Sequence, residues 1–417
     1  MRYRTQARWL CVIAATGLLI AHPGVTGSGR DTGAQSAPGP EFRLLTPPII
    51  AWSTPESFEV FVMTSHPAAC SLEVRKAGDA GGFSAVAGRR HGLIDANETS
   101  HRIVVSGLAS GGKYEYRLVA RQILKFEPYE VAFGSRLETG VHPVDLPEAG
   151  ASEVRFTVLN DLHKNTPLIR DLMERVGTAK PSPHFVILNG DILSQIEGEE
   201  DIPAVLDLPG SYASEHPLIW VRGNHECRGK FARHLTRYLT MPDGRYYYTF
   251  RRGPVQFLVL DNGEDKNDTD PAYSGLVDFD TYRARQQEWF SRVIETPEWK
   301  AAPFRILISH IPVGHLPGDE DEDPMFFPEY KRLWAEIMNR AGLDLEITAH
   351  YHRFRIEDPS DKRTYPVAVG GGPKAETAVI IGVHAAGEAL RLEVFDSKGA
   401  KIAEKGWRSK DASPCIR

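Results

Sequence analysis

Short apolar runs that each lead into a metal-ligand residue type are the feature that most constrains this sequence. The runs occupy residues 154–159, 184–188, 218–221, 256–260, 305–308 and 343–348, with helical patterns between them. Five of these six are followed closely by aspartate, asparagine or histidine, at Asp161 with His163, Asp191, Asn224 with His225, His310, and His350 with His352. Buried strands that alternate with helices form an α/β core, and sites in such folds gather at the carboxyl ends of the strands. The sequence therefore predicts that these side chains meet.

The oxygen and imidazole donors of this set suit Zn, Mn and Fe, and no thiolate is required. Each motif alone has an ordinary interpretation. An Asp-x-His after a strand is usually a surface turn, a Gly-Asp pair is usually a turn, and His310 alone is more often a packed histidine than a ligand. The ordered series decides between the interpretations, because independent accidents at five successive strand ends are improbable. We therefore predict a dinuclear metal site.

The series resembles the motifs of the calcineurin-like metallophosphoesterase superfamily, which read Asp-x-His, Gly-Asp, Gly-Asn-His-Asp/Glu, His and Gly-His-x-His. The resemblance implies an α/β catalytic domain over residues 151–410, built as a four-layer α/β/β/α sandwich with mixed sheets. It also implies two divalent or trivalent metal ions, Fe, Mn or Zn. One ion would be held by Asp161, His163 and His352, the other by Asn224, His310 and His350, and Asp191 would bridge both.

His225 is the motif residue that the resemblance leaves without a metal. Two cations about 3.5–4 Å apart clamp an in-line displacement at phosphorus and provide a metal-bound hydroxide nucleophile near neutral pH. The resemblance implies that His225 contacts the phosphoryl group and protonates the leaving oxygen, which suits an imidazole with an ordinary pKa of about 6.5. The alternative is a structural histidine behind the ligands, and Glu226 would be an orienting carboxylate.

Position 194 departs from two branches of the superfamily. Purple acid phosphatases carry a tyrosine three residues after the bridging aspartate, where this chain has Ser194. A ferric site with a tyrosinate ligand is therefore not expected. Protein Ser/Thr phosphatases carry an aspartate at that position to orient the catalytic histidine, so Ser194 also weakens the case for a phosphoprotein substrate.

Residues 41–145 have an all-β pattern. Tyr114, Tyr116 and Leu118 alternate with charged residues after the turn at 107–112, which is typical of a half-buried strand. A leucine, a tight turn and a tyrosine at a strand start resemble the tyrosine corner of immunoglobulin-like sandwiches. The segment resembles the fibronectin type III-like domain that precedes the catalytic domain of purple acid phosphatases. The alternative is an unrelated β-sandwich.

The N-terminus has the pattern of an export signal. Arg2, Arg4 and Arg8 precede or flank a short apolar stretch at 9–21. We predict a signal peptide at 1–21 and a flexible linker at 22–40, rich in Gly, Ser, Ala and Pro. The protein would be secreted or periplasmic, with no stable membrane span after cleavage. The alternative is an uncleaved N-terminal anchor.

The formal net charge of -6 at pH 7 argues against a nucleic-acid partner, since affinity for a phosphate backbone comes mainly from Lys and Arg. We expect an exported phosphatase or phosphodiesterase that acts on a small phosphorylated substrate. The alternatives are a nuclease of the same superfamily and a non-catalytic surface-binding protein with a degenerate enzyme domain. A degenerate domain should lack ligands, yet every predicted ligand position is filled. The sequence leaves open the choice between monoesters and diesters and the oligomeric state.

Overall fold

The computed structural model describes residues 41–318 and 329–409, and these begin with an all-β region. The predicted signal peptide and linker at 1–40 lie outside the described residues. Seven antiparallel strands form one sheet in the order β1-β2-β7-β8, with β3 and β6 paired to β2, and β9 paired to β7. The bounds are β1 Ile49–Thr54, β2 Ser57–Lys76, β3 Ser84–Ala87, β6 Ala96–Ser106, β7 Lys113–Glu127, β8 Glu130–Glu138 and β9 His142–Asp145; β4 Arg89–Arg90 and β5 Leu93–Ile94 form a separate pair.

The alternation predicted for the strand that begins near Tyr114 is confirmed in β7. Tyr114, Tyr116 and Leu118 are buried, whereas the charged residues between them are more exposed. The Tyr114 hydroxyl accepts a hydrogen bond of 2.8 Å from the backbone N–H of Ala109, the type of contact expected of a tyrosine corner. The fibronectin type III-like assignment itself stays a prediction.

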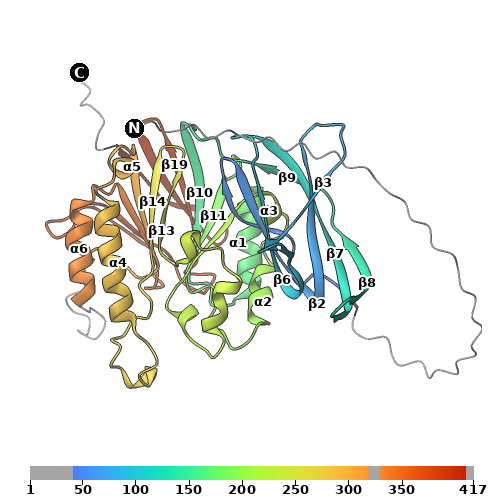
Figure 1. Cartoon of the computed structure of the whole chain (residues 1–417). Helices are drawn as coiled ribbons and strands as arrows, with labels where there is room; N and C mark the ends of the chain where they lie inside the picture. Colours follow the sequence, from blue (N-terminus) through green and yellow to red (C-terminus); the bar gives the residue numbers. More distant parts are fainter. Residues whose placement is uncertain (1–40, 319–328, 410–417) are drawn as a thin grey trace, which may run out of the picture. The chain divides into compact units, whose positions relative to one another are not determined.

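Two six-stranded mixed sheets form the centre of the α/β region that follows (Figure 1). The first has the order β12-β11-β10-β19-β20-β21 and the second the order β13-β14-β15-β16-β18-β17. The first comprises β10 Glu153–Leu159, β11 Phe185–Asn189, β12 Leu218–Val221, β19 Val379–Ala386, β20 Ala389–Asp396 and β21 Lys401–Arg408. The second comprises β13 Tyr248–Arg252, β14 Val255–Leu260, β15 Phe304–Ser309, β16 Leu345–Thr348, β17 Arg355–Glu357 and β18 Val367–Val369. Strands β10, β11 and β12 run parallel, as do β14, β15, β16 and β18, so each group ends at one edge of its sheet.

The sheets share an apolar core, and helices cover their outer faces (Figure 1). The helices α1 Thr166–Thr178, α2 Asp201–Leu206 and α3 Gly210–Glu215 pack on the first sheet. The helices α4 Phe279–Val293, α5 Pro297–Lys300 and α6 Glu329–Arg340 pack on the second. Short 3₁₀ turns are η1 His225–Cys227, η2 Ala232–Arg237, η3 Pro242–Gly244 and η4 Pro271–Tyr273. This mixed α/β arrangement agrees with the predicted order of layers, helix, sheet, sheet, helix.

Helix α1 shows how local sequence sets an element boundary. The Asn165 side chain accepts a hydrogen bond from the backbone N–H of Leu168, and Pro167 occupies the first turn, where its missing N–H costs nothing. The apolar face of this helix is buried against β10 and β11. The helix therefore begins directly after the loop that carries Asp161 and His163.

The all-β region and the α/β region share contacts. Phe61 and Met63 of β2 belong to the same buried cluster as Leu172 of α1. The Tyr116 hydroxyl donates to the carbonyl oxygen of Ser214 at 2.8 Å. Within 41–318 and 329–409, no helix is both long enough and apolar enough to cross a membrane.

Candidate metal centre

The predicted ligands meet where strands of both sheets end. The first sheet supplies Asp161 and His163 after β10, Asp191 after β11 and Asn224 after β12; the second supplies His310 after β15, and His350 and His352 after β16. Ligand atoms of Asp161, His163, Asp191 and His352 lie within 4.8 Å of one another, and so do those of Asp191, His310 and His350. Asn224 adjoins the second group, with its Oδ1 3.1 Å from His350 Nδ1. Asp191 is thus the member common to both groups. Their role as ligands stays a prediction.

Backbone and amide donors fix one oxygen of each central carboxylate. Asp161 Oδ2 accepts hydrogen bonds from Asn160 Nδ2 at 2.6 Å and from the backbone N–H of His350 at 3.0 Å. Asp191 Oδ1 accepts one from the backbone N–H of His225 at 2.9 Å. The second oxygen of each carboxylate is therefore left to face the imidazoles, which is how outer contacts orient metal-binding groups.

The inward oxygens and the imidazole nitrogens converge. Asp191 Oδ2 lies 3.1 Å from His310 Nε2 and 3.8 Å from His163 Nε2. Asp161 Oδ1 lies 3.2 Å from His352 Nε2, and the Nε2 atoms of His163 and His352 are 3.0 Å apart. In the described part of the chain, the enclosed atoms Asp161 Oδ1 and His310 Nε2 make no hydrogen bond of acceptable geometry. Converging donors with unsatisfied buried atoms fit a bound cation.

The electrostatics of the group also favour added positive charge. Burial by itself lowers the pKa of His310, but Asp191 and Asp161 outweigh burial and raise this pKa to about 10. Burial lowers the pKa of His163 and of His350 to about 4. The buried carboxylates therefore attract a cation, while the imidazoles of His163 and His350 remain neutral and free to coordinate one.

The backbone is forced into the left-handed region at most of the predicted ligands. Positive φ values occur at Asp161 (50°), His163 (45°), Asp191 (52°), His350 (75°) and His352 (54°). Such conformations are uncommon for residues other than glycine and cluster at functional sites. Gly190 has a φ of +75°, and a Cβ there would lie 2.4 Å from His310 Nδ1. Position 190 therefore accepts only glycine, because any side chain there would collide with His310.

The Glu226 carboxylate links the loop after β11 to the loop after β12 through hydrogen bonds to their backbones. Its Oε2 accepts from the backbone N–H groups of Asp191 and Gly223, each at 2.8 Å, and its Oε1 from that of Leu193 at 3.0 Å. Burial and the nearby Asp191 raise the pKa of this carboxyl to about 7. Glu226 therefore orients the backbone of the site, in agreement with the expectation of an orienting carboxylate.

His225 faces the same centre from η1. Its Nε2 lies 3.8 Å from Asp191 Oδ2, and its Nδ1 lies 2.6 Å from the backbone carbonyl oxygen of Ser194. A carbonyl only accepts hydrogen bonds, so Nδ1 carries a proton and Nε2 is the ring nitrogen available to a substrate. The backbone at position 194 thus makes the orienting contact that an aspartate side chain was expected to make in protein Ser/Thr phosphatases.

Three further residues around His225 were not predicted. Arg228 Nη1 lies 2.9 Å from His225 Nε2, and Arg228 also pairs with Glu264 and Asp265. Glu264 and Asp265 follow β14, the strand formed by the apolar run at 256–260, to which no candidate ligand was assigned. A polar segment directly after a predicted strand was the available signal.

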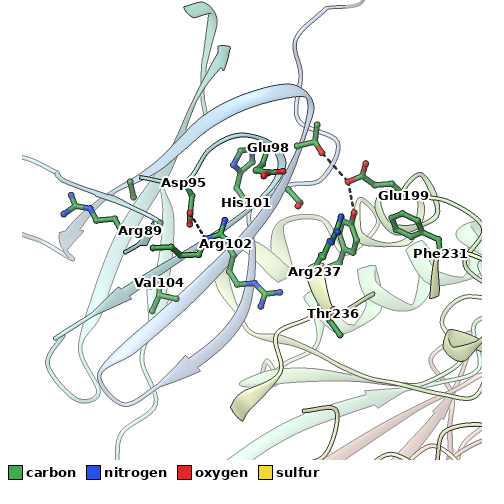
Figure 2. A pocket seen from close by; sticks show the side chains of 16 residues that line it. Arg89, Asp95, Glu98, His101, Arg102, Val104, Glu199, Phe231, Thr236 and Arg237 are labelled. Atoms are coloured by element: carbon green, nitrogen blue, oxygen red, sulfur yellow. Dashed lines mark hydrogen bonds and ion pairs between the residues drawn. The ribbon is translucent and has the colours of Figure 1, made fainter. Parts of the chain in front are cut away.

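The structure also contains a cleft of about 880 Å³, and Figure 2 shows the side chains that line it. It is lined by residues of β6 and of η2, together with Glu199, which accepts hydrogen bonds from Thr99 Oγ1 at 3.3 Å and from the Tyr238 hydroxyl at 2.8 Å (Figure 2). None of the predicted ligands lines it. We therefore locate the candidate functional site at the converging ligand side chains and not in this cleft.

Residues 154–354 match the family model for calcineurin-like phosphoesterases. The region 154–354 is therefore a domain of the calcineurin-like phosphoesterase family. The superfamily resemblance drawn from the motifs is thereby confirmed, and the matched region of the calcineurin-like phosphoesterase domain contains all seven predicted ligands and His225.

Curated relatives match part of the chain at low identity. The mouse protein named serine/threonine-protein phosphatase CPPED1 is 26% identical over 196 residues, which are 45% of this chain and 59% of that protein. Its human counterpart is 24% identical over 195 residues, with the same coverage. The chain thus spans about three-fifths of the length of these relatives. A solved purple acid phosphatase, PPD1 from yellow lupin (Lupinus luteus), has a TM-score of 0.66 at 13% identity and covers 87% of this chain and 74% of its own. That likeness supports the fold of the calcineurin-like phosphoesterase domain.

Proposed function

We propose that this chain is an exported, metal-dependent phosphoester hydrolase whose calcineurin-like phosphoesterase domain holds two metal ions bridged by Asp191. The observation that carries the proposal is the membership of Asp191 in both clusters of candidate ligands. A carboxylate oxygen such as Asp191 Oδ2 has two lone pairs and can contact two cations, whereas an imidazole nitrogen has one and contacts only one.

The donor sets assign the ions to the two sides of Asp191. Asp161, His163 and His352 would hold one ion, and Asn224, His310 and His350 the other. Fe, Mn and Zn all suit these oxygen and nitrogen donors. When bound, such ions polarise the phosphoryl group and lower the pKa of a water molecule, so that hydroxide is available near neutral pH.

The side chains of the protein perform the remaining tasks. Asp161 and Asp191 present their inward oxygens because donors hold their outer ones. His225, held through Nδ1 by the Ser194 carbonyl, presents Nε2 toward the centre. When Nε2 also carries a proton, it would pass that proton to the leaving oxygen. Glu226 holds the Asp191 and Gly223 backbones in register behind these groups.

We propose a small phosphorylated molecule as the substrate, with a phosphoprotein as the second candidate. The second candidate is favoured by the name of the CPPED1 relatives, which describes a serine/threonine-protein phosphatase. The backbone contact of Ser194 also removes part of the argument against it, since His225 is oriented without an aspartate. A nuclease is disfavoured by the net charge of -6.

Export is proposed from the sequence of residues 1–21. It predicts that the mature protein is recovered outside the cytoplasm with a new N-terminus within or near the start of the 22–40 linker. N-terminal sequencing of the secreted or periplasmic fraction tests this. An intact Met1 on membrane-bound protein would instead identify an uncleaved anchor.

The hydrolase proposal is tested with purified mature protein, 4-nitrophenyl phosphate and bis(4-nitrophenyl) phosphate. Each ester is assayed with and without added Mn, Zn or Fe, and bound metal is measured by elemental analysis. We expect metal-dependent cleavage of at least one ester and retention of metal by the purified protein. The proposal fails if neither ester is cleaved with any metal and no bound ion is found.

A further inference from the structure

Arg228 occupies a position between two acids and the candidate proton donor. Its Nε donates to Glu264 Oε1 at 2.9 Å and its Nη2 to Glu264 Oε2 at 2.8 Å, while Nη2 also lies 3.3 Å from Asp265 Oδ1. The acids therefore occupy one edge of the guanidinium. Nη1 is directed elsewhere and lies 2.9 Å from His225 Nε2.

The side-chain exposures of Glu264 and Arg228 show that the carboxylate is buried and that part of the guanidinium is open to solvent. The Glu264 side chain is 3% exposed and that of Arg228 is 30% exposed. A buried carboxylate thus anchors the guanidinium by a two-point hydrogen bond, and the open part of the guanidinium faces the site. A cation held in place before its ligand arrives loses little entropy on binding.

Distances along the contact chain place Nη1 beside the predicted reaction centre. Nη1 lies 2.9 Å from His225 Nε2, which in turn is 3.8 Å from the inward oxygen of Asp191. Because Nδ1 of His225 already donates to Ser194, Nε2 accepts the hydrogen bond from Arg228 in the structure without substrate. An anionic oxygen that enters the centre is a better acceptor than this neutral nitrogen and would take over the Nη1 hydrogen.

Phosphate monoesters and diesters differ in the property that such a cation recognises. A monoester carries a charge of about −1.5 to −2 near pH 7 and three terminal oxygens. A diester carries a single negative charge and two terminal oxygens. An extra guanidinium beside the metal ligands therefore gains most from the additional charge and oxygen of a monoester.

We infer that Arg228, anchored by Glu264, is a specificity-determining residue that binds a terminal phosphoryl oxygen and makes the site selective for phosphomonoesters. This inference rests on the proposed hydrolase function. It deepens that function by naming the substrate class, and no motif of the metal ligand series includes Arg228.

The test compares both nitrophenyl esters in wild-type protein and in Arg228→Gln. Because a hydrogen bond to a charged group contributes about 1.5–3 kcal/mol, the substitution should lower kcat/KM for the monoester about 10- to 100-fold and lower that for the diester much less. Arg228→Lys keeps the positive charge but cannot make the two-point hydrogen bond of a guanidinium. Its monoester rate should therefore lie between those of Arg228→Gln and the wild type. Arg117→Gln is the matched control, because Arg117 also pairs with a glutamate and is 31% exposed, but lies on β7 outside the candidate centre.

Calorimetry supplies a measurement that does not depend on turnover. Binding of inorganic phosphate should weaken by the same factor in Arg228→Gln, whereas binding of dimethyl phosphate should weaken much less. Metal content and thermal melting are measured for each variant. If Arg228→Gln does not fold because Glu264 is left buried without a partner, Arg228→Lys and the double variant Arg228→Gln with Glu264→Gln serve in its place.

Three results would overturn the inference: an equal fall for both esters, an unchanged monoester rate, or a wild-type preference for the diester. The first would identify Arg228 as a structural residue. If the wild type cleaves neither ester with any metal and holds no bound ion, the hydrolase proposal fails, and the phosphate calorimetry still decides whether Arg228 binds phosphate.

Discussion

His225 Nδ1 lies 2.6 Å from the backbone carbonyl oxygen of Ser194. This contact fixes the orientation of the ring and places a proton on Nδ1, because the carbonyl can only accept. The Ser194 hydroxyl does not take part in it, and donates instead to the carbonyl oxygen of His163 at 3.1 Å. The orienting contact is therefore independent of the side chain at position 194.

Replacement of His225 tests its role as a proton donor. His225→Asn should lower kcat for a phosphoester about 100- to 10,000-fold, the usual range for loss of a general acid or base, while bound metal stays constant. The loss should be greater for alkyl phosphates than for nitrophenyl phosphates, because a poorer leaving group needs the proton more. Steady-state kinetics and elemental analysis measure both effects.

Ser194→Ala is the companion variant. It keeps the backbone carbonyl, so it should reduce kcat far less than His225→Asn does. A similar reduction in the two variants would show that the serine side chain has a function that its contacts do not reveal.

The two clusters predict different metal losses for a shared and an unshared ligand. Asp191→Asn should remove both ions, since Asp191 belongs to both groups. His352→Asn should remove one ion and leave the other, since His352 belongs to the first group only. Elemental analysis of the purified variants distinguishes the outcomes. Equal metal content in the two variants would contradict a bridging role for Asp191.

The all-β region contains a histidine that should make folding sensitive to acid. His101 is 5% exposed, and its Nε2 lies 3.2 Å from Thr64 Oγ1. Burial lowers the pKa of His101 to about 4, although Asp95 and Glu98 act in the opposite direction. In the unfolded chain this pKa is about 6.5. The unfolded state therefore binds the proton first, and stability is lost as the pH falls from about 6.5 to about 4.

His101→Gln should flatten this part of the pH dependence. Each unit of pKa difference corresponds to about 1.4 kcal/mol, so the melting temperature of the wild type should fall more between pH 7 and pH 4.5 than that of the variant. Other histidines titrate equally in both proteins and cancel in the comparison. Parallel melting curves across this range would contradict the prediction.

The strand ends could be predicted because each motif is local. A buried apolar run followed by Asp161, Asp191 or His310 is visible in a single segment, and the edge of a parallel sheet brings such segments together. The start of α1 is marked in an equally local way, by the Asn165 cap, by Pro167 and by the apolar residues that follow.

The contacts that support the ligands were hidden because they join distant segments or use the backbone. Glu264 meets Arg228 only because β14 and β12 end near each other, and nothing in either segment encodes the pairing. The Ser194 carbonyl is present at every residue, so no sequence pattern could mark it. Asn160 fixes Asp161 by a side-chain hydrogen bond, and nothing in the apolar run before it marks it for that role.

Gly190 connects the local motif with the geometry of the site, and a pair of alanine variants can measure its contribution. Gly190 has a φ of +75° and Gly387 a φ of +55°, but a Cβ at Gly190 would lie 2.4 Å from His310 Nδ1, whereas one at Gly387 would meet nothing within 4 Å. Gly387→Ala should therefore cost only the backbone strain of about 1–3 kcal/mol and leave metal binding intact.

Gly190→Ala should cost more stability and also weaken metal binding, because His310 or Asp191 must move to admit the methyl group. Thermal melting gives the first effect, and metal retention during dialysis against a weak chelator gives the second. Equal melting temperatures and equal metal retention in the two variants would mean that the loop at Gly190 adjusts freely. The close approach of this loop to His310 would then not be what holds the second cluster in place.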